Sequence, residues 1–487
     1  MALAKAISCG LLAAALTTAA EPIRLHPDNP RYFIYKGKPT LLITSAEHYG
    51  AVINEDFDWR KYLDTLAAQG MNYTRIFTGS YVEAPGNFGI ARNTLAPKPG
   101  RFLAPWARSG EPGYRLGGNR FNLAEFNPAY FDRLKAFTAA AGERGIVVEV
   151  TLFCATYTAV QWEIHPFNPA NHVHGASLAD WKRLNTPDNN GLLAVQEALT
   201  RRIVRELAPY DNVFYEIQNE PWADGGVTVD VLNPYIRGAQ QRQWPNSVDR
   251  ASQASLAFQA KVASWIQDEE KRLGVKHLVA QNWSNFKDSV PALVPGAEVL
   301  NFHYAYPEAA LWNRALNVPA GYDETGFLGF HDADYRAQAW RFLLAGGALF
   351  NNLDYSFSVG FEDGTDFQPD SPGGGSRNLR RQLKFLADFM NGLPFLKMEA
   401  DPALVAHSAG AQTQAFSLPG SVYALYVKGS GPLTLKLNLP KGSYRIQWFS
   451  PETGAKTRDA RLTHGGGLVA VETPEFSEDA AARFDRE

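Results

Sequence analysis

Short apolar runs alternate with helical segments from about residue 40 to residue 390, and this alternation constrains the fold more than any other feature. A chain that repeats strand and helix in this way favours a parallel sheet covered by helices. The runs that we expect to be buried strands are 40–44, 72–77, 145–152, 212–218, 277–281, 297–302, 320–322 and 348–353. The helical patterns between them cover 58–69, 128–144, 192–207, 252–273 and 337–345.

Eight strands spread over roughly 350 residues predict an α/β fold, a (β/α)₈ TIM barrel with loop insertions. A doubly wound open sheet is the structural alternative, but the strands carry no G-x-G-x-x-G turn. After Gly392 the pattern changes to short strands with alternating side chains, which predict a small antiparallel β-sandwich. We therefore expect a barrel over residues 21–392 and a sandwich over 393–487, docked rigidly through Leu393, Phe395 and Leu396.

The first 20 residues have the pattern of a signal peptide. Lys5 precedes the apolar run 6–16, and small residues lead up to a cleavage site near Ala20. The alternative is a buried N-terminal helix. Cleavage would leave Cys154 as the one cysteine, so no internal disulfide is expected. No later apolar segment is long enough to span a bilayer, and we expect a secreted or periplasmic bacterial protein without a membrane span.

The amino-acid composition limits the classes of binding partner that we expect. The net charge of −3 and the isoelectric point of 6.4 give no reason to expect a nucleic-acid partner. Aromatic residues make up 12% of the chain, and their rings suit the faces of sugars, although they are also ordinary core residues. The sequence makes no prediction of the oligomeric state.

Two glutamates follow predicted strands, at the end of the barrel where catalytic groups lie. Glu220, in Asn219-Glu220-Pro221, ends the fourth strand, and Glu324 ends the seventh. Carboxyls that face each other across a barrel mouth can hydrolyse a glycosidic bond, one as acid/base and the other as nucleophile. We expect the charge of Glu324 to raise the pKa of Glu220. Asp323 should point to the opposite side of its strand from Glu324.

With these motifs the chain resembles the large clan of retaining (β/α)₈ glycoside hydrolases, in which Asn-Glu-Pro is the most telling triplet. The resemblance implies that Glu220 is the acid/base, Glu324 the nucleophile and Asn219 a donor to the sugar 2-hydroxyl. It also implies that Arg75 steadies the nucleophile. His303 matches a histidine of the sixth strand, and the accompanying tyrosine is either Tyr304 or Tyr306.

More narrowly, the chain is similar to apiosidase-like bacterial barrels that carry a C-terminal, collagen-binding-like sandwich. The segments 32–39 and 448–454 carry this similarity. The clan-level resemblance implies cleavage of an equatorial bond, and we expect the substrate to be an oligosaccharide or polysaccharide of plants or bacteria.

Several other polar and aromatic residues are candidates for the site. His48 follows the first strand and either lines a sugar subsite or belongs to a structural cluster. Trp222, Trp283 and Tyr355 lie near strand ends and could stack on sugars or be core. Glu149 and Glu216 lie within strands and should be acids of the barrel interior, bonded to their neighbours.

Two other functions compete with a retaining glycosidase. The first is a carbohydrate-binding barrel without turnover, against which Glu220, Glu324 and Arg75 argue. The second is a metal-assisted hydrolase built on His165, His172 and His174, but no H-E-x-x-H helix is present. We expect no metal and no cofactor. The sequence also lacks the G-x-S-x-G elbow of α/β-hydrolase esterases.

Overall fold

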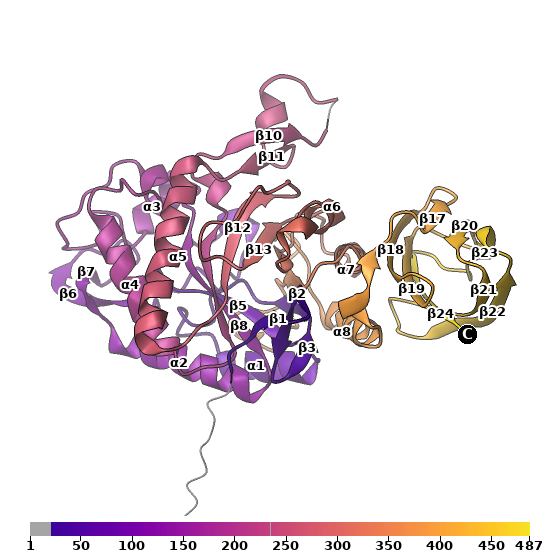
Figure 1. Cartoon of the computed structure of the whole chain (residues 1–487). Coiled ribbons are helices and arrows are strands. Elements are labelled where there is room, and N and C mark those ends of the chain that lie inside the picture. Colours follow the sequence, from indigo (N-terminus) through magenta and orange to yellow (C-terminus); the bar gives the residue numbers. More distant parts are fainter. Residues whose placement is uncertain (1–20, 234) are drawn as a thin grey trace, which may run out of the picture.

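The computed structural model describes residues 21–233 and 235–487 (Figure 1). The predicted signal peptide lies outside the described residues. In the described part of the chain, eight parallel strands form a sheet in the order β4-β15-β14-β13-β12-β9-β8-β5. In chain order these strands are β4 (Leu42–Ala46), β5 (Tyr73–Phe77), β8 (Val147–Cys154), β9 (Val213–Asn219), β12 (Val279–Asn285), β13 (Val299–His303), β14 (Ala320–Glu324) and β15 (Leu349–Leu353). The predicted (β/α)₈ barrel is therefore confirmed.

The barrel closes between β4 and β5 through side-chain and loop contacts. The amide of Asn72 accepts a hydrogen bond from the backbone of Ile43 at 2.9 Å and donates one to Leu41 at 2.8 Å. Further along the seam, the Phe77 N–H donates to the carbonyl of Tyr49 at 3.0 Å. One side chain thus replaces ladder bonds where the first and second strands of the barrel meet.

Helices cover the outside of the barrel, because each presents an apolar face to the strands. They are α1 (Trp59–Ala68), α2 (Pro128–Glu143), α3 (Ala159–Ile164), α4 (Leu192–Leu207), α5 (Gln253–Leu273), α6 (Pro307–Trp312), α7 (Asp332–Leu344) and α8 (Arg377–Asn391). The helix predicted at 337–345 begins five residues earlier, at Asp332, since Asp332 and Asp334 in its first turn complement the helix dipole. Among the described residues, none of these helices combines the length and apolar character needed to cross a membrane.

Two small antiparallel sheets and a β-hairpin joined to β12 decorate the barrel in the described residues, and the sequence patterns had not indicated them. The first sheet precedes the barrel, the second lies between β5 and α2, and the hairpin lies between β9 and α5 and projects from the molecule (Figure 1). They consist of β1 (Arg24–His26), β2 (Asn29–Tyr35) and β3 (Lys38–Thr40), of β6 (Trp106–Pro112) and β7 (Asn119–Phe126), and of β10 (Val227–Val231) and β11 (Ser247–Arg250).

The C-terminal region is the predicted antiparallel sandwich, built in the described residues from a six-stranded and a three-stranded sheet. The larger sheet contains β16 (Glu399–Ala400), β18 (Gln412–Leu418), β19 (Val422–Lys428), β24 (Asp479–Arg486), β21 (Gly442–Phe449) and β22 (Lys456–His464). The smaller one contains β17 (Val405–His407), β20 (Thr434–Leu439) and β23 (Gly467–Glu472). Inward residues of both sheets, such as Leu425 and Leu437, form its own core.

The sandwich packs on α7 and α8 of the barrel. The ring of Trp340 on α7 stacks on Tyr426 of β19, with centroids 5.5 Å apart. Arg336 donates to both carboxylate oxygens of Asp479 at 2.8 and 3.0 Å, and this ion pair is buried. The two regions therefore share a continuous core, which fixes the sandwich relative to the barrel mouth.

Candidate active site

A pocket of about 420 Å³ opens at the carboxyl ends of the barrel strands. Its wall includes Glu220 and Glu324 together with His48, Asn219 and Tyr304. The first, fourth, sixth and seventh strands of the barrel thus each deliver a polar group to one space. This is the position in which barrels of this type place their chemistry.

Glu220 and Glu324 approach closely inside this pocket. A carboxylate oxygen of each and a ring nitrogen of His303 all lie within 4.8 Å of one another. The hydroxyl of Tyr304 lies 3.2 Å from Glu220 and 2.9 Å from Glu324, so it bridges the two carboxylates. Carboxyl groups about 5–5.5 Å apart suit a retaining glycosidase, whereas inverting enzymes need about 6.5–9.5 Å to admit a water.

Residues with a strained backbone follow several of the barrel strands at the mouth of this pocket. Glu220 has φ 47° and Tyr304 has φ 55°, in the left-handed region that residues with bulky side chains rarely adopt. Tyr49, Phe286 and Phe327, which follow three further barrel strands, also have positive φ values. Each such residue costs on the order of 1–3 kcal/mol, and such residues gather at functional sites.

Arg75 connects several polar side chains at the floor of the pocket through hydrogen bonds. Its side chain is fully buried and donates to Glu324 at 3.3 Å, to the Asn219 amide oxygen at 2.8 Å and to Glu216 at 2.9 Å. The guanidinium also lies over the ring of Tyr49, 4.7 Å from its centroid. Its positive charge favours an ionised Glu324, and its fork fixes Asn219 beside Glu220.

His303 sits between three carboxylates. Its Nδ1 lies 3.0 Å from Glu220 and 3.7 Å from Glu324, and its Nε2 lies 3.5 Å from Asp323. Burial opposes a charge on the ring, but the charges of Glu324 and Asp323 prevail and raise the pKa of His303 well above its usual value. The surrounding carboxylates therefore favour the protonated imidazole.

The prediction that the pKa of Glu220 is raised is wrong. Burial pushes this pKa upward, but the hydrogen bond and the charge of His303 outweigh burial and hold it below its usual value. The pKa of Glu324 lies above its usual value, because burial and the charge of Glu220 outweigh His303 and Arg75. The sequence did not reveal the approach of His303 to Glu220.

A layer of acids lies beneath the pocket. Glu216 and Glu149 face the barrel interior, as predicted. Glu216 accepts from Arg75, and Glu149 accepts from Asn301 at 2.8 Å. The prediction for Asp323 is wrong, because its carboxylate also turns inward, 3.1 Å from Asn301 and 3.5 Å from Arg75.

The direction of β14 explains this error. Tyr322 packs outward against Phe342 and Phe350, so the alternation of the strand turns Asp323 inward. The pairing of β13 and β14 shifts its register between Phe302 and His303, and Glu324 is the last residue of the strand. Both neighbouring acids therefore approach the site, at different depths.

Only some of the remaining predicted residues line the pocket. His48 and Tyr355 line the pocket. Tyr304, and not Tyr306, reaches the carboxylates, while Tyr306 lies outside this pocket and is 39% exposed. Trp222 does not line the pocket and packs edge-on against the His303 ring, with centroids 5.3 Å apart.

Trp283 is not a stacking platform for a sugar in this pocket. The strand β12 continues to Asn285, four residues beyond the predicted end, so Trp283 lies within the strand. It alternates with Asn282, whose amide reaches Asp323 in the barrel interior at 3.4 Å, and it therefore faces the outer side.

Sequence reasoning missed several residues of the pocket wall, and two of them, Tyr157 and Glu83, contact predicted site residues. The hydroxyl of Tyr157 accepts from the Asn219 amide at 2.9 Å. Glu83 lies 3.2 Å from His48 and accepts from Tyr81 at 2.9 Å. Both belong to loops after strands, where no periodic pattern signals an inward side chain.

Two clusters in the described residues could hold a metal ion, and both contain His303: one adds Glu216 and Asp323, the other Glu220 and Glu324. Arg75 lies 3.3 Å from Glu324 and 3.5 Å from Asp323, so its charge opposes a cation at either cluster. The loop histidines do not form such a cluster among the described residues. Burial lowers the pKa of His165 to about 3, and its Nδ1 accepts from the Phe167 N–H at 3.1 Å.

Comparisons with known proteins agree with this architecture. No family model matches the chain, and no curated protein matches it. A solved structure described as "Glycoside hydrolase" is 12% identical, with a TM-score of 0.63 over 96% of this chain and 97% of that chain. A glycoside hydrolase family 5 structure from Bacteroides vulgatus ATCC 8482 is 13% identical, with a TM-score of 0.61 over 96% and 93% of the two chains.

The similarity extends over barrel and sandwich together, because nearly the whole chain is covered. The chain therefore has the fold of these (β/α)₈ glycoside hydrolases, and the expected resemblance to the clan is confirmed for the fold.

Proposed function

We propose that this protein is an exported, retaining glycoside hydrolase that cleaves an equatorial glycosidic bond of an oligosaccharide or polysaccharide by double displacement. The observation that carries the proposal is the pair Glu220 and Glu324, whose carboxylate oxygens lie within 4.8 Å at the barrel mouth. The export rests on the signal-peptide pattern of residues 1–20.

In the first step Glu324 attacks the anomeric carbon while Glu220 donates its proton to the departing glycosidic oxygen. The C–O bond to the leaving group breaks, and an ester bond between the sugar and Glu324 forms. Arg75 and Tyr304 keep the attacking carboxylate oriented, with contacts of 3.3 and 2.9 Å. Asn219, fixed by Arg75 and Tyr157, is placed to bind the sugar 2-hydroxyl.

In the second step a water attacks the same carbon, Glu220 takes its proton, and Glu324 leaves as a carboxylate. The proximity of the two acids supports this exchange of roles. The charge of an ionised Glu324 opposes the lowering of the pKa of Glu220 by His303 and so favours the protonated acid in the first step. Esterification removes that charge, so the pKa of Glu220 falls further when a base is needed. Two displacements at one carbon return the original configuration.

The protein should be screened for hydrolysis of plant and bacterial polysaccharides, with mass spectrometry of the products. We expect activity on at least one β-D-pyranoside or sterically equivalent α-L-sugar. Glu220→Gln and Glu324→Gln should abolish it, whereas Glu163→Gln, on the exposed end of α3, should not. Activity that survives in both site variants, or that disappears with a chelator and returns with zinc, would contradict the proposal.

A further inference from the structure

A second and larger pocket lies beside the first, between the barrel and the sandwich. It is a cleft of about 1040 Å³, part of which is open to solvent, and its wall includes Gln412 and Lys428 from the sandwich and Arg341 from α7. Tyr304 and Phe327 line both pockets. A substrate whose reacting sugar fills the first pocket can therefore extend over these two rings into the second.

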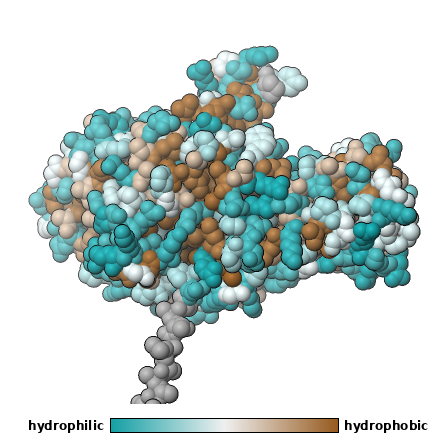
Figure 2. Space-filling model, viewed as in Figure 1, coloured by the Kyte–Doolittle hydropathy of each residue, from teal (hydrophilic) through white to brown (hydrophobic). Residues whose placement is uncertain are grey.

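Aromatic rings form the wall of this second pocket. Trp244, which follows the β10 strand of the projecting hairpin, packs against Phe327 with centroids 4.3 Å apart and against Tyr304 at 5.3 Å. Trp244, Tyr306 and Phe327 remain 37%, 39% and 47% exposed. Figure 2 shows hydrophobic residues gathered at the foot of this hairpin and towards the sandwich. Exposed rings of this kind suit the apolar faces of sugars.

The charged side chains that line the pocket leave an excess of positive charge. Asp334 is neutralised by Lys428, whose Nζ lies 2.9 Å away. Arg341 has no ion pair with any described residue, and its Nε is buried without a hydrogen-bond partner. The Oε1 of Gln338, another lining residue, is likewise buried and unpartnered. A buried polar atom without a partner is costly, and a bound ligand that supplies the partner removes this cost.

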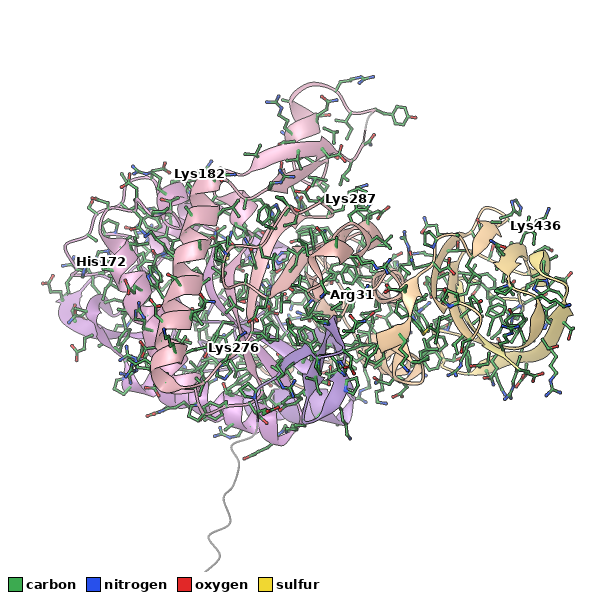
Figure 3. All side chains as sticks on the ribbon, viewed as in Figure 1. Arg31, His172, Lys182, Lys276, Lys287 and Lys436 are labelled. Atoms are coloured by element: carbon green, nitrogen blue, oxygen red, sulfur yellow. The ribbon has the colours of Figure 1, made fainter. Side chains whose placement is uncertain are left out.

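A second cationic side chain lies next to Tyr306 of the aromatic wall. Lys287 lies between the projecting hairpin and the sandwich (Figure 3), with its Nζ 5.6 Å from the centroid of Tyr306 and 5.4 Å from that of Trp312. Within residues 21–233 and 235–487 this amine has no acidic partner at ion-pair distance. The aromatic wall is thus flanked by positive charge that the protein itself does not neutralise.

We propose that this pocket binds a negatively charged sugar unit of the substrate and that Arg341 recognises its acidic group. The proposal rests on the proposed glycosidase function and adds the substrate class, a glycan that carries carboxylate or sulfate groups. A guanidinium fork pairs with either group through parallel N–H donors, and neighbouring rings hold the sugar face.

The test is a binding measurement that needs no turnover. Full-length Glu324→Gln protein is titrated calorimetrically at low ionic strength with three sets of methyl β-glycosides. The sets contain glucose, galactose and mannose as the neutral sugars, as the uronates and as the 6-sulfates. We expect the acidic form of at least one sugar to bind about fivefold more tightly than its neutral parent, and salt to weaken this preference. The uronate and sulfate arms distinguish the two sources of charge.

Arg341→Gln should remove the preference for the acidic form, Arg341→Lys should retain part of it, and Arg60→Gln should leave it unchanged. Arg60 is an exposed arginine on α1 that lines neither pocket, so it controls for a general loss of charge. Equal binding of acidic and neutral sugars, no detectable binding of any acidic sugar, or a preference that survives in folded Arg341→Gln would overturn the proposal. These results are independent of hydrolysis and hence of the proposed activity.

Discussion

The Nδ1 of His303 lies 3.0 Å from a carboxylate oxygen of Glu220, and this contact sets the acidity of the proposed proton donor. The hydrogen bond and charge of His303 overcome burial and lower the pKa of Glu220. The charges of Glu324 and Asp323 in turn raise the pKa of His303 against the effect of burial. The proton needed for bond cleavage therefore depends on a residue of β13, which β12 separates from β9 in the barrel.

Replacing His303 by Gln should move the alkaline limb of kcat/KM to higher pH. The charge of His303 lowers the pKa of Glu220, so its removal raises that pKa and keeps Glu220 protonated further into the alkaline range. The measurement is a pH profile of kcat/KM. Trp222→Phe, which keeps the histidine and changes only its edge-on neighbour, should leave the limb in place. A limb that stays or moves to lower pH in His303→Gln would contradict this role.

Glu220→Gln should lose activity mainly on substrates with poor leaving groups. General acid catalysis contributes about 10²- to 10⁴-fold, and an activated aryl leaving group departs without it. Added azide should restore turnover of the aryl substrate and give a glycosyl azide of retained configuration. Equal losses on both kinds of substrate without azide rescue would show that Glu220 is not the acid/base.

Asp479→Asn should destabilise the whole protein. Arg336 would keep a buried charge without its counter-ion at the junction of barrel and sandwich, at a cost of about 3–5 kcal/mol. The readout is the melting temperature or the urea midpoint. Asp459→Asn, which breaks an exposed ion pair with Arg445 on the sandwich surface, should change stability little. An equally small effect of Asp479→Asn would mean that the junction contributes little.

His165 should make the protein less stable at mildly acidic pH. Its pKa in the folded state is about 3, so below pH 6.5 the unfolded chain binds a proton that the buried ring does not. Stability is complete above pH 6.5 and falls by roughly 2 kcal/mol on going to about pH 5. The free energy of unfolding is measured in urea above pH 6.5 and at about pH 5. Its change between these two conditions should be smaller in His165→Gln than in the wild type. The exposed His407→Gln serves as control, and an unchanged difference in His165→Gln would refute the assignment.

The sequence was sufficient to predict the positions of the barrel strands. Apolar runs of strand length located the barrel strands, because a strand buried on both faces consists almost wholly of apolar residues. Glu220 and Glu324 could be found because barrel chemistry lies at strand ends. The fold brings them together although 104 positions separate them in the chain.

Details that depend on a few residues could not be predicted. The extension of β12 to Asn285 places Trp283 within the strand and not at its end. Asp323 turns inward by the alternation of β14, and the register shift at its end lets Glu324 approach the site as well. Tyr157 and Glu83 come from irregular loops, where side-chain direction follows from tertiary contacts alone. The lowered pKa of Glu220 depends on a distance between two strands, which composition and periodicity do not encode.

The central claim is that Glu324 attacks the anomeric carbon and Glu220 serves both half-reactions. A mechanism-based inhibitor, such as a 2-fluoro glycoside or a cyclophellitol of the matching sugar, would trap the intermediate for peptide mapping by mass spectrometry. We expect a single label on Glu324 within Tyr322-Asp323-Glu324-Thr325-Gly326, with none on Asp323. In parallel, NMR of the first minutes of hydrolysis should show a product of retained configuration. A label on any other acid, or an initial product of inverted configuration, would contradict the account.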